Sequence, residues 1–229
     1  MCFFNAIRRN YLSLAVLAAV GVPASAATVD YTTTASFTGC TNCAVTGNGT
    51  GNVTVVYGTG TNTATLVFTG TPAGTSVDSD AVYTTASYGT LTATYTGTGA
   101  NLNGSFKLMI DQTVPNLSPT MGTLGTATLS GLVFDGKSTS YADFGTVQDP
   151  RISLGGPVVY ELDTSGNINN PTHYGYTITS PSTGNPAGVT SLQGNIQATP
   201  EPTFLTLTGL GLLAMAGFAV MRKRAAVGA

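Results

Sequence analysis

The amino-acid sequence predicts a mostly β protein: a single, jelly-roll-like β-sandwich between an N-terminal signal peptide and one C-terminal transmembrane helix. Three observations predict this arrangement. Short central runs alternate apolar and polar residues, turns rich in glycine and asparagine separate these runs, and an apolar stretch lies near each end of the chain. No central segment shows a helical period over ten residues. We therefore divide the chain into 1–26, 27–198 and 199–229.

The first part, 1–26, has the pattern of a signal peptide. Arg8 and Arg9 form a basic start, and the apolar run that follows, 11–22, is 12 residues long. A membrane-spanning helix needs about 20 residues, so this run is short for a permanent anchor. Small residues follow the run, and they predict cleavage between Ala26 and Ala27. The alternative is an uncleaved anchor.

The central part, 27–198, is predicted to be one domain of strands. Five runs show the alternation, at 53–57, 64–68, 91–95, 106–110 and 174–178. Turns are predicted at 58–62 and 97–101, loops at 114–121, 167–171 and 181–188, and a last strand at Val189–Ala198. Threonine fills many polar positions, and this β-branched residue fits a pleated surface. We expect roughly eight to twelve short strands in two sheets.

Charge limits the partners of this domain. Nine acidic residues stand against three basic ones between 27 and 198, which leaves a net charge of −6. The whole chain has a net charge of only −2, because five of its eight basic residues lie in the two ends. An acidic surface with few lysines argues against nucleic acid and against anionic lipid as partners.

Two cysteines lie close together in the central part. Two residues separate Cys40 from Cys43, and in an exported protein this spacing favours a disulfide that pins a turn. The alternative is a redox-active pair, which prefers a helix start and a basic neighbour. A metal site would need further Cys or His ligands, and His173 is the only histidine in the chain.

Acidic pairs and the single histidine are the other candidates for chemistry. Asp78 and Asp80, expected in a loop, are candidate Ca²⁺ ligands, with solvated acids as the alternative. Glu161 and Asp163 form the second pair, and a glycosidase would need such carboxylates in a cleft. We expect His173 at a strand edge, and the chain has no Gly-x-Ser-x-Gly motif. We predict no catalytic residues, no required cofactor and no enzymatic activity.

The last part, 199–229, combines three features in a fixed order. A Pro-Glu-Pro triplet precedes an uncharged run of 19 residues, and a basic cluster follows it; these are Pro200, Glu201, Pro202, then 203–221, then Arg222, Lys223 and Arg224. As a helix the run would measure about 28 Å, close to the thickness of a bilayer core. The basic cluster predicts that its own end stays cytoplasmic and that the central domain lies outside. The alternatives are a buried helix and, for the triplet, an ordinary loop.

This order of triplet, apolar run and basic cluster resembles a PEP-CTERM sorting signal. That tail occurs on exported proteins of Gram-negative bacteria that make exopolysaccharide. The resemblance implies recognition by an exosortase, a membrane-embedded cysteine transpeptidase that cuts near Pro200-Glu201-Pro202 and transfers or releases the rest of the chain. It implies a precursor anchored in the inner membrane, and then a protein at the cell surface or in the extracellular matrix. The resemblance covers only the tail and says nothing about the ectodomain.

Three hypotheses for the ectodomain follow. The first is a structural or adhesive protein of the exopolysaccharide or biofilm. The second is a carbohydrate-binding module, which predicts a cluster of exposed tyrosines on one sheet face beside the Asp78–Asp80 loop. The third is a secreted hydrolase, which predicts a cleft with paired acids, or an acid beside His173. We take the first as the main hypothesis.

Overall fold

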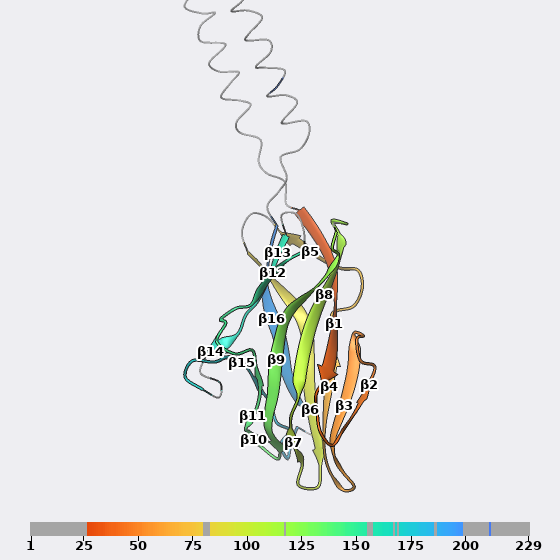
Figure 1. The fold of residues 1–229 in the computed structure, drawn as a ribbon, viewed down its shortest axis with the longest axis vertical. Coiled ribbons are helices and arrows are strands. Elements are labelled where there is room, and N and C mark those ends of the chain that lie inside the picture. Colours follow the sequence, from red (N-terminus) through yellow and green to blue (C-terminus); the bar gives the residue numbers. More distant parts are fainter. Residues whose placement is uncertain are drawn as a thin grey trace, which may run out of the picture. The chain divides into compact units, whose positions relative to one another are not determined.

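Strands form most of the part of the chain that the computed structural model describes. The described residues are 27–79, 83–116, 118–154, 158–166, 168, 170–185, 187–198 and 211. The chain divides into two units, one of Ala26–Thr199 and one of Met1–Ser25 with Pro200–Ala229. Among its described residues, the first of these units contains sixteen strands and no helix (Figure 1). The prediction of a mostly β fold is confirmed.

The strands form two curled antiparallel sheets. The first sheet has the order β14-β15-β11-β9-β8-β1-β5, with β7 and β10 also paired to β9. Its strands are β1 (Ala27–Thr38), β5 (Thr75–Ser79), β7 (Ala100–Leu102), β8 (Ser105–Val114), β9 (Met121–Phe134), β10 (Lys137–Ser138), β11 (Ser140–Asp143), β14 (Ser165–Gly166) and β15 (Tyr174–Ile178).

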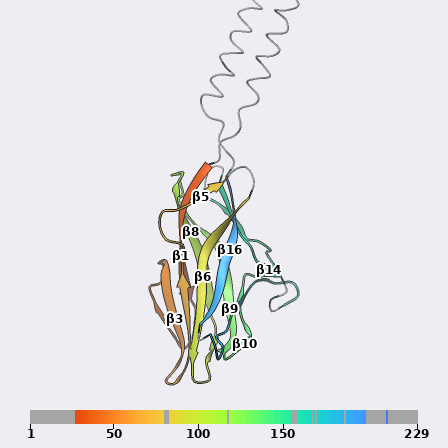
Figure 2. The same ribbon diagram turned by 180° about the vertical axis from the view of Figure 1, so that it is seen from behind.

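The second sheet has the order β12-β13-β16-β6-β4-β3-β2. Its strands are β2 (Cys43–Thr46), β3 (Asn52–Thr59), β4 (Asn62–Thr69), β6 (Thr84–Thr96), β12 (Arg151–Ser153), β13 (Val158–Leu162) and β16 (Gly188–Ala198). Figure 1 presents β1, β8 and β9 of the first sheet, and the view from behind in Figure 2 presents β6 and β16 of the second.

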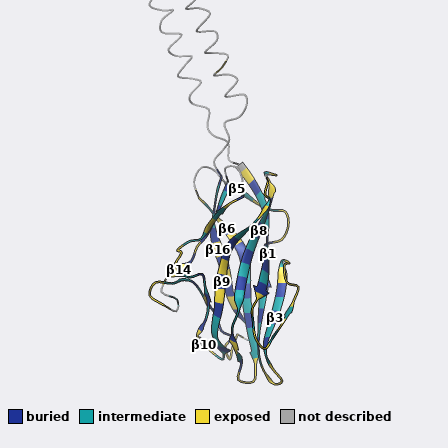
Figure 3. Ribbon diagram, viewed as in Figure 1, coloured by how far each residue is buried: buried dark blue, intermediate teal, exposed yellow. Residues whose placement is uncertain are grey.

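Alternate side chains of both sheets meet in one hydrophobic core. Strands alternate buried and partly exposed residues along their length, as the colours of Figure 3 show. The ring of Phe68 on β4 lies 5.8 Å from the ring of Phe106 on β8, and the rings of Tyr31 and Tyr88 are 6.0 Å apart. Each of these side chains is at most 1% exposed. Most polar side chains of these strands therefore point outward, which is what a period of two produces.

The predicted runs all fall within strands, but several strands are longer than predicted. The run 53–57 lies in β3, 64–68 in β4, 91–95 in β6, 106–110 in β8 and 174–178 in β15. However, β1, β6, β9 and β16 have 12, 13, 14 and 11 residues, so the expectation of eight to twelve short strands is wrong. In β6 the pairing with β16 shifts register near Gly89. Gly89 has φ +112°, and a Cβ there would lie 2.4 Å from the carbonyl oxygen of Thr69. A bulge of this kind breaks the apparent period without ending the strand.

A buried threonine explains why the alternation did not reveal β1. Thr33 is fully buried between Tyr31 and Ala35, so a polar residue stands where the pattern requires an apolar one. Its hydroxyl donates to the carbonyl oxygen of Tyr88 at 3.0 Å and accepts the amide of Thr71 at 2.7 Å. Because both hydrogen-bonding functions are satisfied, the hydroxyl can be buried at low cost.

Buried tyrosines link the two sheets through their hydroxyl groups. The hydroxyl of Tyr31 on β1 donates to the carbonyl oxygen of Ser87 on β6 at 2.9 Å and so joins the two sheets. The hydroxyl of Tyr88 donates to the carbonyl oxygen of Asn195 at 2.8 Å within the second sheet. The hydroxyl of Tyr160 donates to Oε1 of the buried Gln112 at 2.8 Å. The amide of Gln112 in turn donates to the carbonyl oxygen of Pro115 at 2.7 Å. The core therefore contains a polar layer whose groups are paired with one another.

Replacing Tyr57 by phenylalanine is expected to stabilise the domain. Tyr57 is 1% exposed, and its hydroxyl has no hydrogen-bond partner among the described residues. Removing an unpaired buried hydroxyl should raise the free energy of unfolding by about 1 kcal/mol. Tyr160→Phe is the matched control, because it leaves Oε1 of Gln112 without its donor and should lower the same quantity by about 1 to 3 kcal/mol. Urea unfolding of the two variants measures both changes, and equal losses would contradict the prediction.

Candidate functional site

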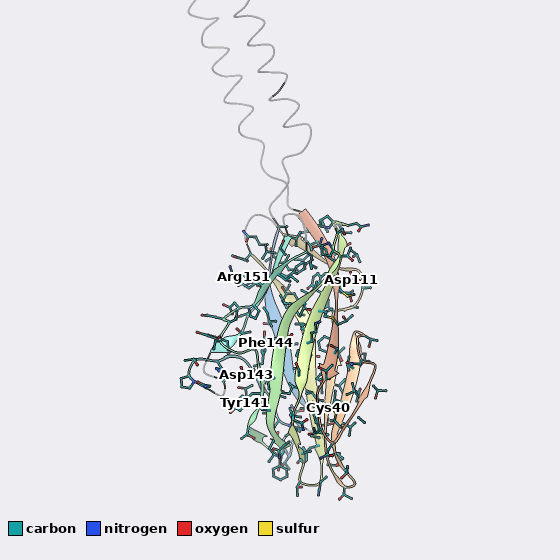
Figure 4. All side chains as sticks on the ribbon, in the orientation of Figure 1. Cys40, Asp111, Tyr141, Asp143, Phe144 and Arg151 are labelled. Atoms are coloured by element: carbon teal, nitrogen blue, oxygen red, sulfur yellow. A yellow bond between two sulfur atoms is a disulfide. The ribbon has the colours of Figure 1, made fainter. Side chains whose placement is uncertain are left out.

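An acid and the single histidine come together where two strands of the first sheet meet. β11 ends at Asp143, and His173 immediately precedes β15. These strands pair with Asp143 opposite Gly175, so the end of one lies beside the start of the other. Nδ1 of His173 lies 2.7 Å from Oδ2 of Asp143. Figure 4 shows Asp143 beside Tyr141 and Phe144, in a different part of the domain from Arg151.

The same carboxylate is held from its other side. Oδ1 of Asp143 accepts the amide of Gly145 at 2.7 Å, and the backbone amide of His173 donates to the carbonyl oxygen of Asn170 at 2.9 Å. The side chain of Asp143 is 13% exposed and that of His173 is 31% exposed. The imidazole is therefore oriented by a largely buried acid while its edge reaches solvent. The two residues are 30 positions apart, and no local pattern in the sequence joins them.

This pair supplies one part of a hydrolytic site. An acid that orients a histidine is the second half of a nucleophile–base–acid arrangement, and the histidine then needs a nucleophile within hydrogen-bonding distance. Among the described residues, no serine, threonine or cysteine side chain hydrogen-bonds to His173. No group of three or more His, Cys, Asp or Glu side chains suited to a metal occurs among them either. The acid beside His173 that the hydrolase hypothesis required is therefore present, without a partner nucleophile in the part described.

The second acidic pair does not bring two carboxylates together. Glu161 lies on β13, is 7% exposed and forms an ion pair with Nε of Arg151, which lies opposite it on the edge strand β12. Oε1 of Glu161 also accepts the side-chain amide of Asn195 at 3.4 Å. Asp163 lies beyond the end of β13, and its carbonyl oxygen accepts the hydroxyl of Tyr176. Arg151 therefore balances the charge of Glu161, whose role is structural. The guanidinium of Arg151 also lies 5.9 Å from the ring centre of Tyr83.

Replacing Arg151 by glutamine should destabilise the β12 edge. The change leaves the carboxylate of Glu161 buried without a cation, because its Oε2 contacts Nε of Arg151 and has no other hydrogen-bond partner among the described residues. The side chain of Arg151 is 56% exposed, so solvent screens part of the pair and the expected loss is about 1 to 2 kcal/mol. Arg151→Gln with Glu161→Gln should recover most of that loss, because the double variant buries no charge. Thermal unfolding of both variants checks this, and a double variant less stable than the Arg151→Gln variant would contradict the prediction.

The predicted calcium loop is only partly described, and the described part is a strand. Asp78 lies in the edge strand β5 rather than in a loop, which corrects the expectation. Its Oδ1 accepts the hydroxyl of Thr28 on β1 at 3.0 Å. Pairing with β1 extends the strand through Ser79, and this long-range pairing is not visible in the local sequence. Asp80 lies outside the described residues.

The two cysteines of the strand-built unit are joined by a disulfide. Cys40 and Cys43 are bonded, with their Cα atoms 6.0 Å apart. The bridge closes the turn between β1 and β2, and Asn42 within it has φ 53°. The amide of Thr41 in the same turn donates to the side chain of Asn103 at 2.6 Å. The bridge therefore lies in a turn between strands, with no helix start beside it among the described residues.

The exposed tyrosine cluster that the carbohydrate-binding hypothesis predicts is not formed by the described residues. Of the nine tyrosines between residues 27 and 198, four are buried, namely Tyr31, Tyr57, Tyr88 and Tyr160. Tyr83 is 44% exposed, and its ring lies below Arg151. Tyr176 directs its hydroxyl to the backbone of Asp163 and Gln193. Most of these tyrosine rings therefore pack in the core or at its margin instead of forming an exposed cluster.

The predicted processing points lie at the ends of the strand-built unit. Ala27 begins β1, and Ala198 ends β16. The other predicted residues of these points lie outside the described residues; they are Ala26, Pro200, Glu201, Pro202, Arg222, Lys223 and Arg224. The apolar run 203–221 also lies outside them, apart from Gly211. Within the described part of the chain, no helix has the length and apolar character needed to cross a membrane.

Comparisons with known proteins give no family for this chain. No protein-family model, no curated protein and no solved structure matches it. The functional argument therefore rests on the residues of the chain and on the geometry of its two sheets.

Proposed function

We propose that this protein is exported, sorted by an exosortase-like membrane transpeptidase and delivered to the cell surface or the extracellular matrix, where it has a structural or adhesive role. The observation that carries the proposal is the agreement between the folded unit and the two ends. Strand β1 begins at Ala27, directly after the predicted signal cleavage, and β16 ends two residues before Pro200. The unit spans Ala26–Thr199, so both predicted cuts would spare every strand.

The two sheets are proposed to form a single, jelly-roll-like sandwich. Support comes from the ring contacts between sheets, such as Phe68 with Phe106, and from one hydrophobic cluster that draws on both sheets. The chain also passes repeatedly from one sheet to the other, for example from β4 to β5 and back to β6. A folded domain of this kind can be exported, retained by its tail and then released without rearrangement.

The adhesive role is proposed from the outward side chains. They are mainly threonine, serine, asparagine and glutamine, which present hydroxyl and amide groups to a hydrated matrix such as exopolysaccharide. Each such contact is weak by itself, but many copies displayed on one surface would bind the matrix firmly through their combined contacts. The mechanism requires no cofactor.

Intact mass and location of the protein test the sorting proposal. The full chain is expressed in its host, with and without the exosortase-like enzyme, beside a variant with Glu201→Ala. We expect a mature form that begins near Ala27 and ends near Pro200-Glu201-Pro202, released from the inner membrane only when the enzyme is present. The Glu201→Ala variant should remain in the membrane with its tail intact. A matched change outside the triplet, Thr208→Ala, should leave processing unchanged.

Two outcomes would contradict the proposal. An intact tail in both hosts would make the triplet an ordinary loop before an anchor. Equal processing of the Glu201→Ala variant and the unmodified chain would show that the triplet is not the recognised element.

A further inference from the structure

Five neighbouring strands of the second sheet contain no charged residue. These strands, β16, β6, β4, β3 and β2, are adjacent in the sheet, although they come from three separate stretches of the chain. Their sequences contain no Asp, Glu, Lys, Arg or His. Pairing between distant segments has therefore assembled an uncharged sheet region in a domain whose net charge is −6.

The outward side chains of this region form regular rows across the strands. In one row, Thr54, Val67, Thr92 and Val189 lie opposite one another in turn. Three further rows run parallel to it, and in one of them the hydroxyls of Thr63 and Thr96 form a hydrogen bond of 2.8 Å. We call these outward side chains of β3, β4, β6 and β16 the neutral face; they include Thr54, Val56, Thr65, Val67, Thr90, Thr92, Thr94, Val189 and Ser191. The side of the domain that carries β6 and β16 faces the viewer in Figure 2.

The neutral face is accessible and carries exposed methyl groups. Val189 is 52% exposed, and the threonines and valines of the other strands are half-buried by their neighbours in the sheet. The aromatic residues of these strands point to the opposite side, where Tyr57, Phe68 and Tyr88 are at most 1% exposed. The face therefore offers no aromatic ring on which a sugar could stack.

Charges lie on the other sheet and at the β12–β13 end. Asp30, Lys107 and Asp111 are partly exposed on β1 and β8 of the first sheet, and Asp143 ends β11. Packed sheets lie about 10 Å apart, and the Debye length at physiological ionic strength is about 8 Å. Two copies that meet through their neutral faces would keep the charges of their first sheets separated by about 30 Å, well beyond that length. Any contact through the first sheet would bring acidic residues of both copies together.

We propose that the neutral face binds the neutral face of a second copy of this chain. β-branched side chains of two such sheets can interdigitate, as they do between the sheets of a sandwich. Four strands spaced about 4.8 Å apart give a contact about 20 Å on each side, or roughly 400 Å². A standard interface buries about 800 Å² on each partner, so a single contact is weak and becomes strong only when many copies are displayed together. The use of this contact in adhesion rests on the proposed function, while the association itself does not.

Sedimentation of the full-length chain in a nonionic detergent tests the contact. The unmodified chain should show weak, concentration-dependent dimerisation, with a Kd of roughly 0.1 to 1 mM that changes little with salt. Thr65→Glu with Thr92→Glu places like charges on the neutral face and should weaken dimerisation at least about tenfold. Thr34→Glu with Thr126→Glu adds the same charge to the outward side of the first sheet and should leave dimerisation unchanged, since that sheet is not in the contact. Circular dichroism checks that both variants fold.

A charge-exchange pair makes the test specific for contact between copies. Thr92→Lys and Thr92→Glu should each dimerise less well than the unmodified chain, and their mixture should recover the dimer. A mixture that stays monomeric would overturn the proposal, as would a chain that is monomeric throughout or a neutral-face variant that dimerises like the unmodified one. Association that appears only when dextran is added would point to a neutral polysaccharide and would overturn it too. A chain that dimerises but is not processed would contradict the proposed sorting and leave this contact standing.

Discussion

Raising the pH above 10 is expected to unfold the domain, because its tyrosines can lose their protons more easily in the unfolded chain than in the buried core. Burial raises the pKa of Tyr31 from 10.0 to about 12. Burial also raises the pKa of Tyr57, Tyr88 and Tyr160. In the unfolded chain these phenols ionise near pH 10, whereas in the folded domain they keep their protons to a higher pH.

The sign of the effect follows from the number of bound protons. Below pH 10 both states are protonated, so the contribution of these tyrosines to stability is constant. Above pH 10 the unfolded chain loses protons first and the free energy of unfolding falls as pH rises through the folded pKa values. A shift of two pKa units at Tyr31 corresponds to about 3 kcal/mol, against a total of about 5 to 15 kcal/mol for a typical domain. Several such groups together should exhaust the stability of the domain.

Urea unfolding between pH 8 and pH 12, followed by tyrosinate absorbance, measures this loss. Tyr31→Phe should make the decline with pH less steep, because one proton no longer distinguishes the two states. Phe37→Leu, a change at a buried ring that carries no hydroxyl, should leave the slope as it is. Stability that stays flat to pH 12 would show that water reaches these phenols in the folded state.

Phe106→Ala should be among the most destabilising substitutions in the core. Phe106 is fully buried on β8, and its ring lies 5.1 Å from that of Phe37 and 5.8 Å from that of Phe68. It therefore joins β1 and β8 of the first sheet to β4 of the second. Removing such a ring loses its burial and leaves a cavity, which costs about 3 to 5 kcal/mol.

Two variants serve as controls for this cavity. Phe134→Ala removes a half-buried ring that lies 5.5 Å from Tyr95, and it should cost about 1 to 2 kcal/mol because solvent can fill the space. Phe106→Leu keeps most of the volume and should cost less than about 1.5 kcal/mol. Urea unfolding gives all three values, and a loss at Phe134 equal to that at Phe106 would contradict the central place of Phe106 in the core.

The sequence could predict those features that depend on neighbouring residues. Alternate side chains of a strand point to opposite faces, so the spacing of Val53, Val55 and Leu66 predicted both the strands and the burial of these residues. The loop between β8 and β9 could likewise be predicted from Pro115 and Pro119, because proline cannot continue a sheet ladder. The signal peptide and the sorting tail are also predicted from consecutive apolar and basic residues, and they stay predictions because these residues lie outside the described part of the chain.

Residues that depend on a distant partner could not be predicted in this way. Thr33 is buried because Thr71 and Tyr88 satisfy its hydroxyl, and Glu161 is buried because pairing of β12 with β13 places Arg151 opposite it. The pairing of β11 with β15 likewise brings Asp143 to a histidine 30 positions away.

Composition, period two and the turn residues were determined by the sequence alone, because each is a property of a few consecutive residues. The signal peptide and the sorting tail stay predictions of the same kind. The register of the strands decided the rest. It placed most tyrosine rings in the core or at its margin, and it assembled the uncharged strands β16, β6, β4, β3 and β2 side by side. Strand register is set by hydrogen bonds and packing between segments far apart in the chain, which only the tertiary structure brings together.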